Sequence, residues 1–180
     1  MSFPKPYADA VAKLRVPCGF LLAGAFLWFS KPSPLSLAVG LPVSMLGLAL
    51  RAWAAGHLEK NLSLAASGPY ARVRNPLYLG TLTAAAGLAA TAREWRLGLL
   101  FAAVFLLVYL PVVELEEQHL NRLFPDFQEY ARRVPRLRPR LGPVPIDKAF
   151  RWPLYRRNRE YEALAGFLAG AAVLVWKMLR

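Results

Sequence analysis

The residues best suited to chemistry gather in a short polar segment at 67–80. It combines turn formers with arginines, an asparagine and two tyrosines, directly before an apolar run. Proline and glycine interrupt a helix here, whereas Pro76 suits the first turn of a new helix, where its missing N–H costs nothing. The segment therefore predicts a loop that delivers Arg72, Arg74 and Asn75 to the entrance of a helix.

A second polar segment follows the apolar run 97–113 and is acidic. The helical pattern continues past that run through Glu116 and Glu117. A helix of about 30 residues would measure roughly 45 Å, against a hydrocarbon core of about 30 Å, so its last turns would project beyond a membrane. Pro111 predicts a kink that leans the acidic turn toward the loop 67–80. Because neighbouring helix positions are about 100° apart, we expect one of the two carboxylates to face the cavity and the other to face solvent.

Other catalytic patterns are missing from the sequence. There is no Ser-His-Asp, Cys-His or phosphate-loop pattern, so hydrolysis and phosphoryl transfer have no candidate residues. Cys18 is the single cysteine, and His57 and His119 are far apart without a partner motif, so we predict no metal site. What remains is a loop with exposed amides, tyrosines and arginines opposite an acidic turn, which could hold a cofactor bearing an adenosine and a cation.

The apolar runs that position these segments decide the fold class. More than half of the 180 residues are apolar, yet the net charge is +12, and the two properties are segregated along the chain. Tryptophans lie near the ends of the runs, as interfacial anchors do, and flanking residues can extend each run toward the ~20 residues that cross a bilayer. The sequence therefore predicts an all-α membrane protein with about five transmembrane helices, with a soluble helical bundle as the alternative. The runs free of Asp, Glu, Lys and Arg are residues 16–30, 34–50, 77–92, 97–113 and 163–176.

The distribution of Lys and Arg predicts how the chain lies in the membrane. Most of the 23 cationic residues precede the first run, or lie between the second and third and between the fourth and fifth runs. Because cytoplasmic loops carry the excess of basic residues, we expect the N-terminus and the loop 67–80 in the cytoplasm, and the C-terminus outside the cytoplasmic (inner) membrane. Residues 1–15 predict either a short amphipathic helix at the interface or a frayed basic tail.

The C-terminal part of the chain predicts membrane lipids and a second copy of the chain as partners. Arginines between 132 and 159 stand among prolines, a tract that next to membrane spans favours anionic lipid headgroups over nucleic acid. The extra span 161–180 contains Gly166 and Gly170 at helical spacing. This pair predicts a packing face that serves either inside the monomer or in a homodimer.

The two polar segments together resemble a known family. Residues 68–80 read Gly-Pro-Tyr-Ala-Arg-Val-Arg-Asn-Pro-Leu-Tyr-Leu-Gly, and Glu116-Glu117 and the segment 124–135, ending Arg-Val-Pro, follow after one span. This order and spacing is similar to that of the isoprenylcysteine carboxyl methyltransferase and phospholipid methyltransferase superfamily. The resemblance covers about residues 51–139 of a single domain that comprises residues 1–180.

The resemblance implies methyl transfer from S-adenosylmethionine at the membrane face, to a lipid-like or prenylcysteine-like acceptor that enters from the bilayer. Such a displacement needs alignment and a desolvated site more than a strong base, which fits a site without a triad. The resemblance implies a catalytic role for Arg74 or Asn75, and Arg51, His57 and Arg72 are candidates for substrate binding. It assigns the cofactor pocket to Leu62, Ser63, Leu64, Ala65, Tyr70, Asn75, Pro76, Leu77, Tyr78 and Glu116.

Two positions differ from the family pattern. Asn75 stands where the family has a histidine, and an asparagine forms hydrogen bonds but cannot carry a proton. Val112 stands where the eukaryotic isoprenylcysteine enzymes have an arginine for the substrate carboxylate, a role that Arg51, Arg72 or Arg74 would have to fill. Two other functions stay open. One is an NADPH-dependent membrane reductase of the sterol or steroid type, whose C-terminal spans look similar; the other is a non-catalytic membrane scaffold.

Overall fold

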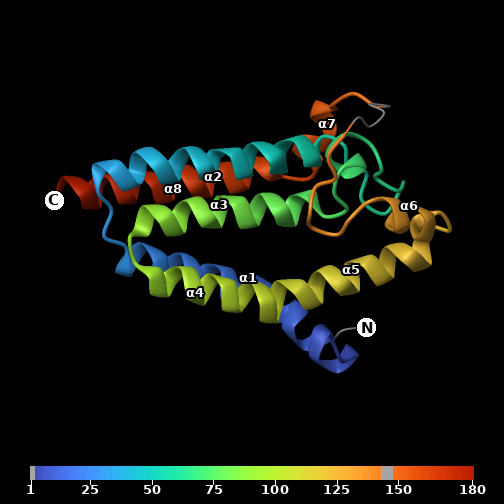
Figure 1. The fold of residues 1–180 in the computed structure, drawn as a ribbon, viewed down its shortest axis with the longest axis horizontal. Helices are drawn as coiled ribbons and strands as arrows, with labels where there is room; N and C mark the ends of the chain where they lie inside the picture. Colours follow the sequence, from blue (N-terminus) through green and yellow to red (C-terminus); the bar gives the residue numbers. More distant parts are fainter. Residues whose placement is uncertain (1–2, 143–147) are drawn as a thin grey trace.

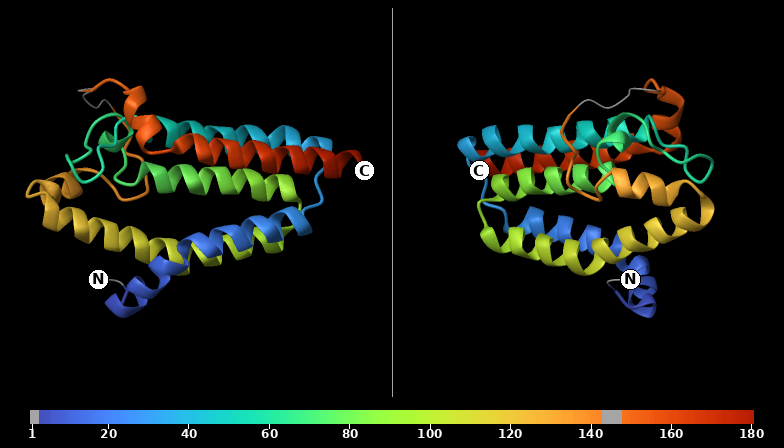
Figure 2. Two further views of the ribbon diagram at one scale, coloured as in Figure 1. Left: turned by 180° about the vertical axis from the view of Figure 1, so that it is seen from behind. Right: turned by 45° about the vertical axis from the view of Figure 1, so that its right-hand side comes forward.

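The computed structural model describes residues 3–142 and 148–180, and all regular secondary structure in these ranges is helical. Figure 1 shows the long helices side by side, with the loops and short helices gathered at one end of the bundle. In both views of Figure 2, α2, α3 and α8 form one layer, and α1 and α4 run along the other. The long elements are α1 (Lys5–Phe29), α2 (Pro34–Ala55), α3 (Pro76–Ala92), α4 (Trp95–Val104), the π-helical turn η2 (Phe105–Tyr109), α5 (Leu110–Leu123) and α8 (Glu160–Leu179), and the short ones are η1 (Gly68–Ala71), α6 (Phe127–Arg133) and α7 (Trp152–Arg157).

Four helices of the described residues have the length and apolar composition to cross a membrane: α1, α2, the continuous helix Trp95–Leu123 and α8. Their outer surfaces carry large apolar side chains, such as Phe20 at 75% and Trp28 at 80% exposure, which a bilayer would cover. The prediction of an all-α membrane protein is confirmed. The fifth predicted span forms α3, whose 17 residues rise only about 25 Å and pack lengthwise against α2.

Glycines allow α2 and α3 to approach closely. A Cβ at Gly47 would collide with the backbone of Gly80 and Ala84, and one at Gly40 would collide with Gly87. Small residues at such contacts let the two backbones pack against each other. This packing places the C-terminal end of α2 directly beside the N-terminal end of α3, where the polar segment 67–80 ends.

The predicted kink at Pro111 takes the form of the π-helical turn η2 directly before α5. Pro111 has no N–H to donate to the carbonyl of Leu107, one helical turn earlier. The hydroxyl of Tyr7 donates to that carbonyl oxygen instead, at 2.6 Å. Because Tyr7 belongs to α1, residues 5–15, for which the sequence allowed a separate interfacial helix or a frayed tail, are part of a single helix that contacts η2; residues 1 and 2 lie outside the described range.

Lys177 of α8 binds the C-terminal end of α1. The ammonium group of Lys177 donates to the carbonyl oxygens of Leu27, Trp28 and Ser30, at 2.7–3.0 Å. These carbonyls end α1, so they have no partner within the helix and lie at the negative end of its dipole.

Lys177→Met should therefore lower the free energy of unfolding by about 1–3 kcal/mol, because it removes charge-assisted hydrogen bonds at a helix end. Thermal unfolding in detergent measures the effect. Lys31→Met is the matched control, since this exposed lysine only pairs loosely with Glu94, at 3.9 Å, and it should change stability by less than about 0.5 kcal/mol. Equal effects of the two variants would contradict the capping role.

Candidate functional site

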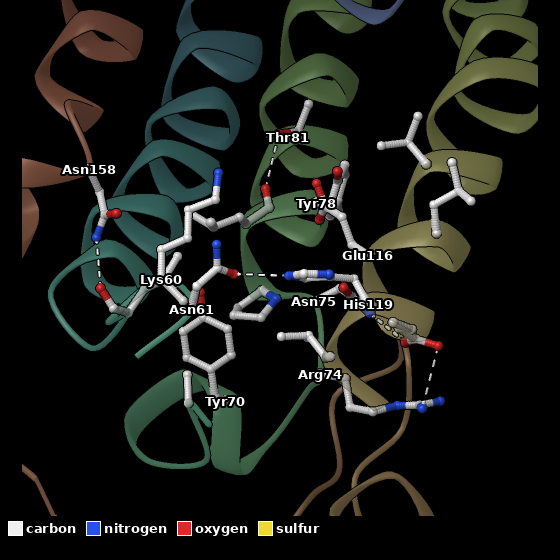
Figure 3. A pocket seen from close by; sticks show the side chains of 18 of the residues that line it. Lys60, Asn61, Tyr70, Arg74, Asn75, Tyr78, Thr81, Glu116, His119 and Asn158 are labelled. Carbon is white, nitrogen blue, oxygen red and sulfur yellow. Dashed lines mark hydrogen bonds and ion pairs between the residues drawn. The ribbon is translucent and has the colours of Figure 1, made fainter. Parts of the chain in front are cut away.

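A cavity of about 1000 Å³ opens at the end of the bundle where the loops gather. Its wall is made by the middle of α1, the C-terminal end of α2, the start of α3, α5, and the first residue of α8, together with the loop 58–65. Figure 3 shows Tyr70, Asn75, Tyr78 and Glu116 around this space. The two polar segments of the sequence, 67–80 and the acidic turn of α5, therefore meet on one cavity.

Most of the predicted site residues line this cavity. Leu62 does not, and its side chain is 66% exposed. The predicted residues on the wall are Arg51, Ser63, Leu64, Ala65, Tyr70, Arg74, Asn75, Pro76, Leu77, Tyr78 and Glu116.

Two predicted substrate-binding residues lie outside the cavity. His57 is buried, with Nδ1 2.9 Å from the carbonyl oxygen of Trp53 and Nε2 3.2 Å from that of Lys148. Its ring also packs against Gly68, which has a φ of +57° and leaves no room for a Cβ. Arg72 donates to the carbonyl oxygen of Gly142 at 3.1 Å. In this arrangement both side chains hold loops in place.

Glu117 is the centre of a buried ionic cluster. Its carboxylate accepts from Nδ2 of Asn75 at 2.8 Å and from Nε and Nη2 of Arg136 at 3.0 and 2.7 Å. Nη1 of Arg74 lies 3.5 Å from the same carboxylate, whose side chain is 8% exposed. Asn75 therefore does not cap α3 with its side chain, although it occupies the N-cap position. It joins the loop to α5.

Glu116 has a different environment, although it lines the same cavity. Its side chain is 48% exposed, and Nη1 of Arg15 lies 3.2 Å from its carboxylate. Arg15 also donates to the hydroxyl of Tyr78 at 3.4 Å. Both glutamates line the cavity, so the expectation that one of them faces solvent is wrong. They still divide their roles: the buried Glu117 fixes the loop, and the half-exposed Glu116 presents its carboxylate to the cavity.

Helix α6 supports the loop and adds Phe127 and Tyr130 to the cavity wall. Phe127, Tyr130 and Val134 form a buried apolar cluster, and Leu64 from the cavity wall packs against it. The hydroxyl of Tyr130 donates to the carbonyl oxygen of Tyr70 at 2.8 Å, and burial raises the pKa of Tyr130. The backbone after α6 continues this support, because the carbonyls of residues 135 and 136 accept from the amides of residues 74 and 75.

Two buried donor groups on the cavity wall have no partner among the described residues. They are the hydroxyl of Tyr70 and Nε of Arg74. Tyr70 is 6% exposed, and burial raises its pKa far above its ordinary value, so the hydroxyl keeps its proton. A buried donor without a partner costs free energy, and its presence on a cavity wall indicates a place for a ligand acceptor.

Several charged residues at the cavity are not predicted by the sequence, because they lie on helices outside the two motifs. Arg15 of α1 donates to the carboxylate of Glu116. Nε and Nη2 of Arg51 donate to the carboxylate of Glu160 on α8, at 3.0 and 2.8 Å. Nη1 of Arg51 also donates to Thr81. A charged residue at the border of an apolar run needs a counter-charge, which is the signal that could have found Glu160.

The loop 58–65 contacts α5 at the cavity wall. Oδ1 of Asn61 lies 3.3 Å from Nε2 of His119 on α5, and Figure 3 draws this contact between the two lining residues as a dashed line. Asn158 fixes the start of this loop by donating to the carbonyls of Ala55 and Leu58, both at 2.9 Å. Within residues 3–142 and 148–180, no group of three or more His, Cys, Asp or Glu side chains is placed to hold a metal ion.

Comparisons with known proteins agree with the predicted resemblance. Residues 42–126 match the family model described as phospholipid methyltransferase. The chain is 37% identical over 135 residues to the cobalt-zinc-cadmium resistance protein CzcN of Cupriavidus metallidurans, covering 71% of this chain and 62% of that protein. It is 37% identical over 108 residues to the nickel-cobalt-cadmium resistance protein NccN of Alcaligenes xylosoxydans xylosoxydans, covering 57% and 51%. The chain thus spans less than two thirds of these relatives, and no solved structure matches it.

Proposed function

Because residues 42–126 match the family model described as phospholipid methyltransferase, we propose that this membrane protein is a methyltransferase that uses S-adenosylmethionine. The observation that carries the proposal is the meeting of both family motifs on one cavity. Tyr70, Asn75 and Tyr78 come from the first motif and Glu116 from the second. The volume of about 1000 Å³ is at the upper end of small-molecule sites, so cofactor and acceptor could share it.

The residues on the wall fit the chemistry of this cofactor. The half-exposed carboxylate of Glu116 can accept hydrogen bonds from ribose hydroxyls or lie near a positive charge. The hydroxyl of Tyr70 and Nε of Arg74 are buried hydrogen-bond donors for which the described residues supply no acceptor, so a bound ligand could supply one. S-adenosylmethionine supplies a methyl group on a positively charged sulfur. Loop 58–65 and α6 would exclude water from the displacement, which gains from desolvation and alignment.

The predicted catalytic candidates then act by positioning. The side-chain amide of Asn75 cannot transfer a proton in the reaction. Its hydrogen bond to Glu117 instead fixes the position of the loop relative to α5. Arg74 contacts the same glutamate while its Nε stays available to an anionic group of a ligand. The acceptor in this proposal is lipid-like or prenylcysteine-like, and the cavity faces the cytoplasm from the inner membrane, following the distribution of basic residues.

Titration of the detergent-purified protein with S-adenosylhomocysteine and with NADPH tests the proposal. We expect S-adenosylhomocysteine to bind at micromolar concentration or below, and Glu116→Ala to weaken binding at least tenfold. Glu129→Ala is the matched control, since among residues 3–142 and 148–180 the exposed Glu129 pairs only with Arg133 on the surface of α6. Binding of NADPH alone would favour a reductase and reject the proposal, and binding of neither would favour a scaffold.

Tyr70→Phe and Tyr130→Phe should separate ligand binding from stability. Tyr70→Phe removes a hydroxyl without a partner, so it should weaken S-adenosylhomocysteine binding about fivefold, or roughly 1 kcal/mol, and leave thermal stability unchanged or higher. Tyr130→Phe removes the donor to the carbonyl of Tyr70, so it should lower the free energy of unfolding by about 1–2 kcal/mol. Calorimetric titration and thermal unfolding measure both, and equal stability losses would contradict the assignment.

A further inference from the structure

Helix α7 lies at the level where two membrane spans end. Figures 1 and 2 show it beside the end of α2, whereas α6 lies further out, at the far end of α5. Asn158, directly after α7, donates to the carbonyl oxygens of Ala55 and Leu58, and α8 begins at Glu160. Because α2 and α8 have the length and composition of membrane spans, this places α7 at the depth of the lipid headgroups.

A row of aromatic rings continues from the end of α2 to α7. The ring of His57 lies between those of Trp53 and Phe150, with centroids 6.2 and 6.3 Å away. The ring of Phe150 contacts that of Trp152 at 5.2 Å, and it fills the space beside Gly56, where a Cβ would lie 2.2 Å from it. The tryptophans at the two ends are 43% and 66% exposed. Indole rings in such positions are typical of a membrane interface.

The charge around α7 is strongly positive and only partly neutralised. Residues 148–159 contain five cationic side chains and no acidic one. Three neighbouring carboxylates are already paired: Glu59 with Arg151, Glu160 with Arg51, and Glu162 with Arg159. Within residues 3–142 and 148–180, Arg156 and Arg157 form no ion pair, and both are exposed. Two positive charges therefore remain for an anionic ligand.

Arg156 and the exposed tryptophan share one face of α7. Trp152 and Arg156 are four positions apart, so they lie one above the other on the helix. Leu154 is buried and packs the opposite face against the protein. A cation and an indole ring side by side at headgroup depth match a phospholipid, whose phosphate adjoins its acyl chains. A soluble anion would use the cation alone.

We propose that α7 binds the headgroup of an anionic phospholipid, with Arg156 and Arg157 as donors to the phosphate and Trp152 as the anchor beside the acyl chains. A guanidinium presents parallel N–H groups that match the oxygens of a phosphate. Arg151, at the start of α7, pairs with Glu59 of the loop 58–65 at 2.7 Å, so the bound lipid borders the segment that lines the cavity. The site is independent of the proposed methyl transfer.

Native mass spectrometry of the detergent-purified protein tests the site without cofactor or turnover. The protein is titrated with dioleoylphosphatidylglycerol, which is anionic, and with dioleoylphosphatidylcholine, which is not. We expect the anionic lipid to bind at least about fivefold more tightly, and Arg156→Gln/Arg157→Gln to remove this preference. Arg132→Gln/Arg133→Gln is the matched control, since it removes the same charge from exposed positions of α6 and should change the preference by less than about twofold. Trp152→Leu should weaken both lipids alike, because it removes the anchor and no charge.

Several outcomes would overturn the inference. Equal binding of the two lipids, or equal loss of preference in the two double variants, would show that α7 holds no defined headgroup site. Competition by millimolar inorganic phosphate would identify a site for a soluble anion, and binding of a single-stranded DNA oligonucleotide that the α7 double variant loses would identify a nucleic-acid surface; either result rejects the lipid. If thermal unfolding shows that the double variant does not fold, Arg156→Gln alone takes its place and should halve the preference.

Discussion

Glu117→Ala is expected to lower the free energy of unfolding by roughly 2–4 kcal/mol and to remove S-adenosylhomocysteine binding. The substitution leaves two guanidiniums, from Arg74 and Arg136, without their shared carboxylate, and it releases the amide of Asn75. Breaking a buried ion pair usually costs about 3–5 kcal/mol, and we lower this range because Arg136 is 40% exposed and stays partly hydrated. The loop 67–80 loses its connection to α5, so the cavity loses its shape.

Thermal unfolding and ligand titration of three variants check this prediction. Glu117→Gln keeps one acceptor for Asn75 and should lose less stability than Glu117→Ala. Glu116→Ala is the neighbouring control: it should bind the ligand poorly but unfold within about 1 kcal/mol of the unmodified protein, because Glu116 and its partner Arg15 are 48% and 41% exposed. If the two alanine variants were equally stable, the division of roles between the glutamates would be wrong.

Arg51→Met should be the other strongly destabilising change, with a loss of about 3–5 kcal/mol. Arg51 and Glu160 are 23% and 10% exposed and form two hydrogen bonds, so the substitution leaves a buried carboxylate without a partner. Glu160→Leu should be similarly harmful, because it leaves the guanidinium unpaired. The pair joins α2 to α8, and α8 would loosen from the bundle in either variant.

The double variant Arg51→Met/Glu160→Leu tests whether these losses of stability come from breaking the ion pair. Apolar residues of similar volume can replace a buried ion pair at little cost, so the double variant should recover to within about 2 kcal/mol of the unmodified protein. Unfolding of the four proteins in detergent completes the cycle. Additive losses in the double variant would mean that the two side chains act independently, contrary to the structure.

The sequence could predict the parts of the site that have a local signal. Turn formers before Pro76 predict the loop and the helix entrance, and the structure places α3 from Pro76. The acidic turn and the proline before it predict that α5 reaches the loop, and Glu116 and Asn75 do line one cavity. The apolar runs predict the helices, because their lengths and charges depend only on composition.

The remaining features depend on tertiary packing. Leu62 lies in an irregular loop, where no periodicity tells which side chain faces the cavity. Arg15 and Glu160 enter the site from the first and last long helices, and no spacing rule connects them to the motifs. The apolar run 77–92 predicts a span, but the helix that it forms, α3, is shorter than a full span. Its packing along α2 depends on tertiary contacts that the run itself does not indicate.

The contact of Lys177 with the end of α1 also bears on the order of assembly. The chain is made from its N-terminus, so α1 emerges first and its terminal carbonyls must wait until residue 177 has been added. Until then, the earlier helices can pair, as α2 does with α3, but the bundle is not closed around the first one. A chain interrupted before Lys177 would lack this closing contact and should be more open to proteolysis.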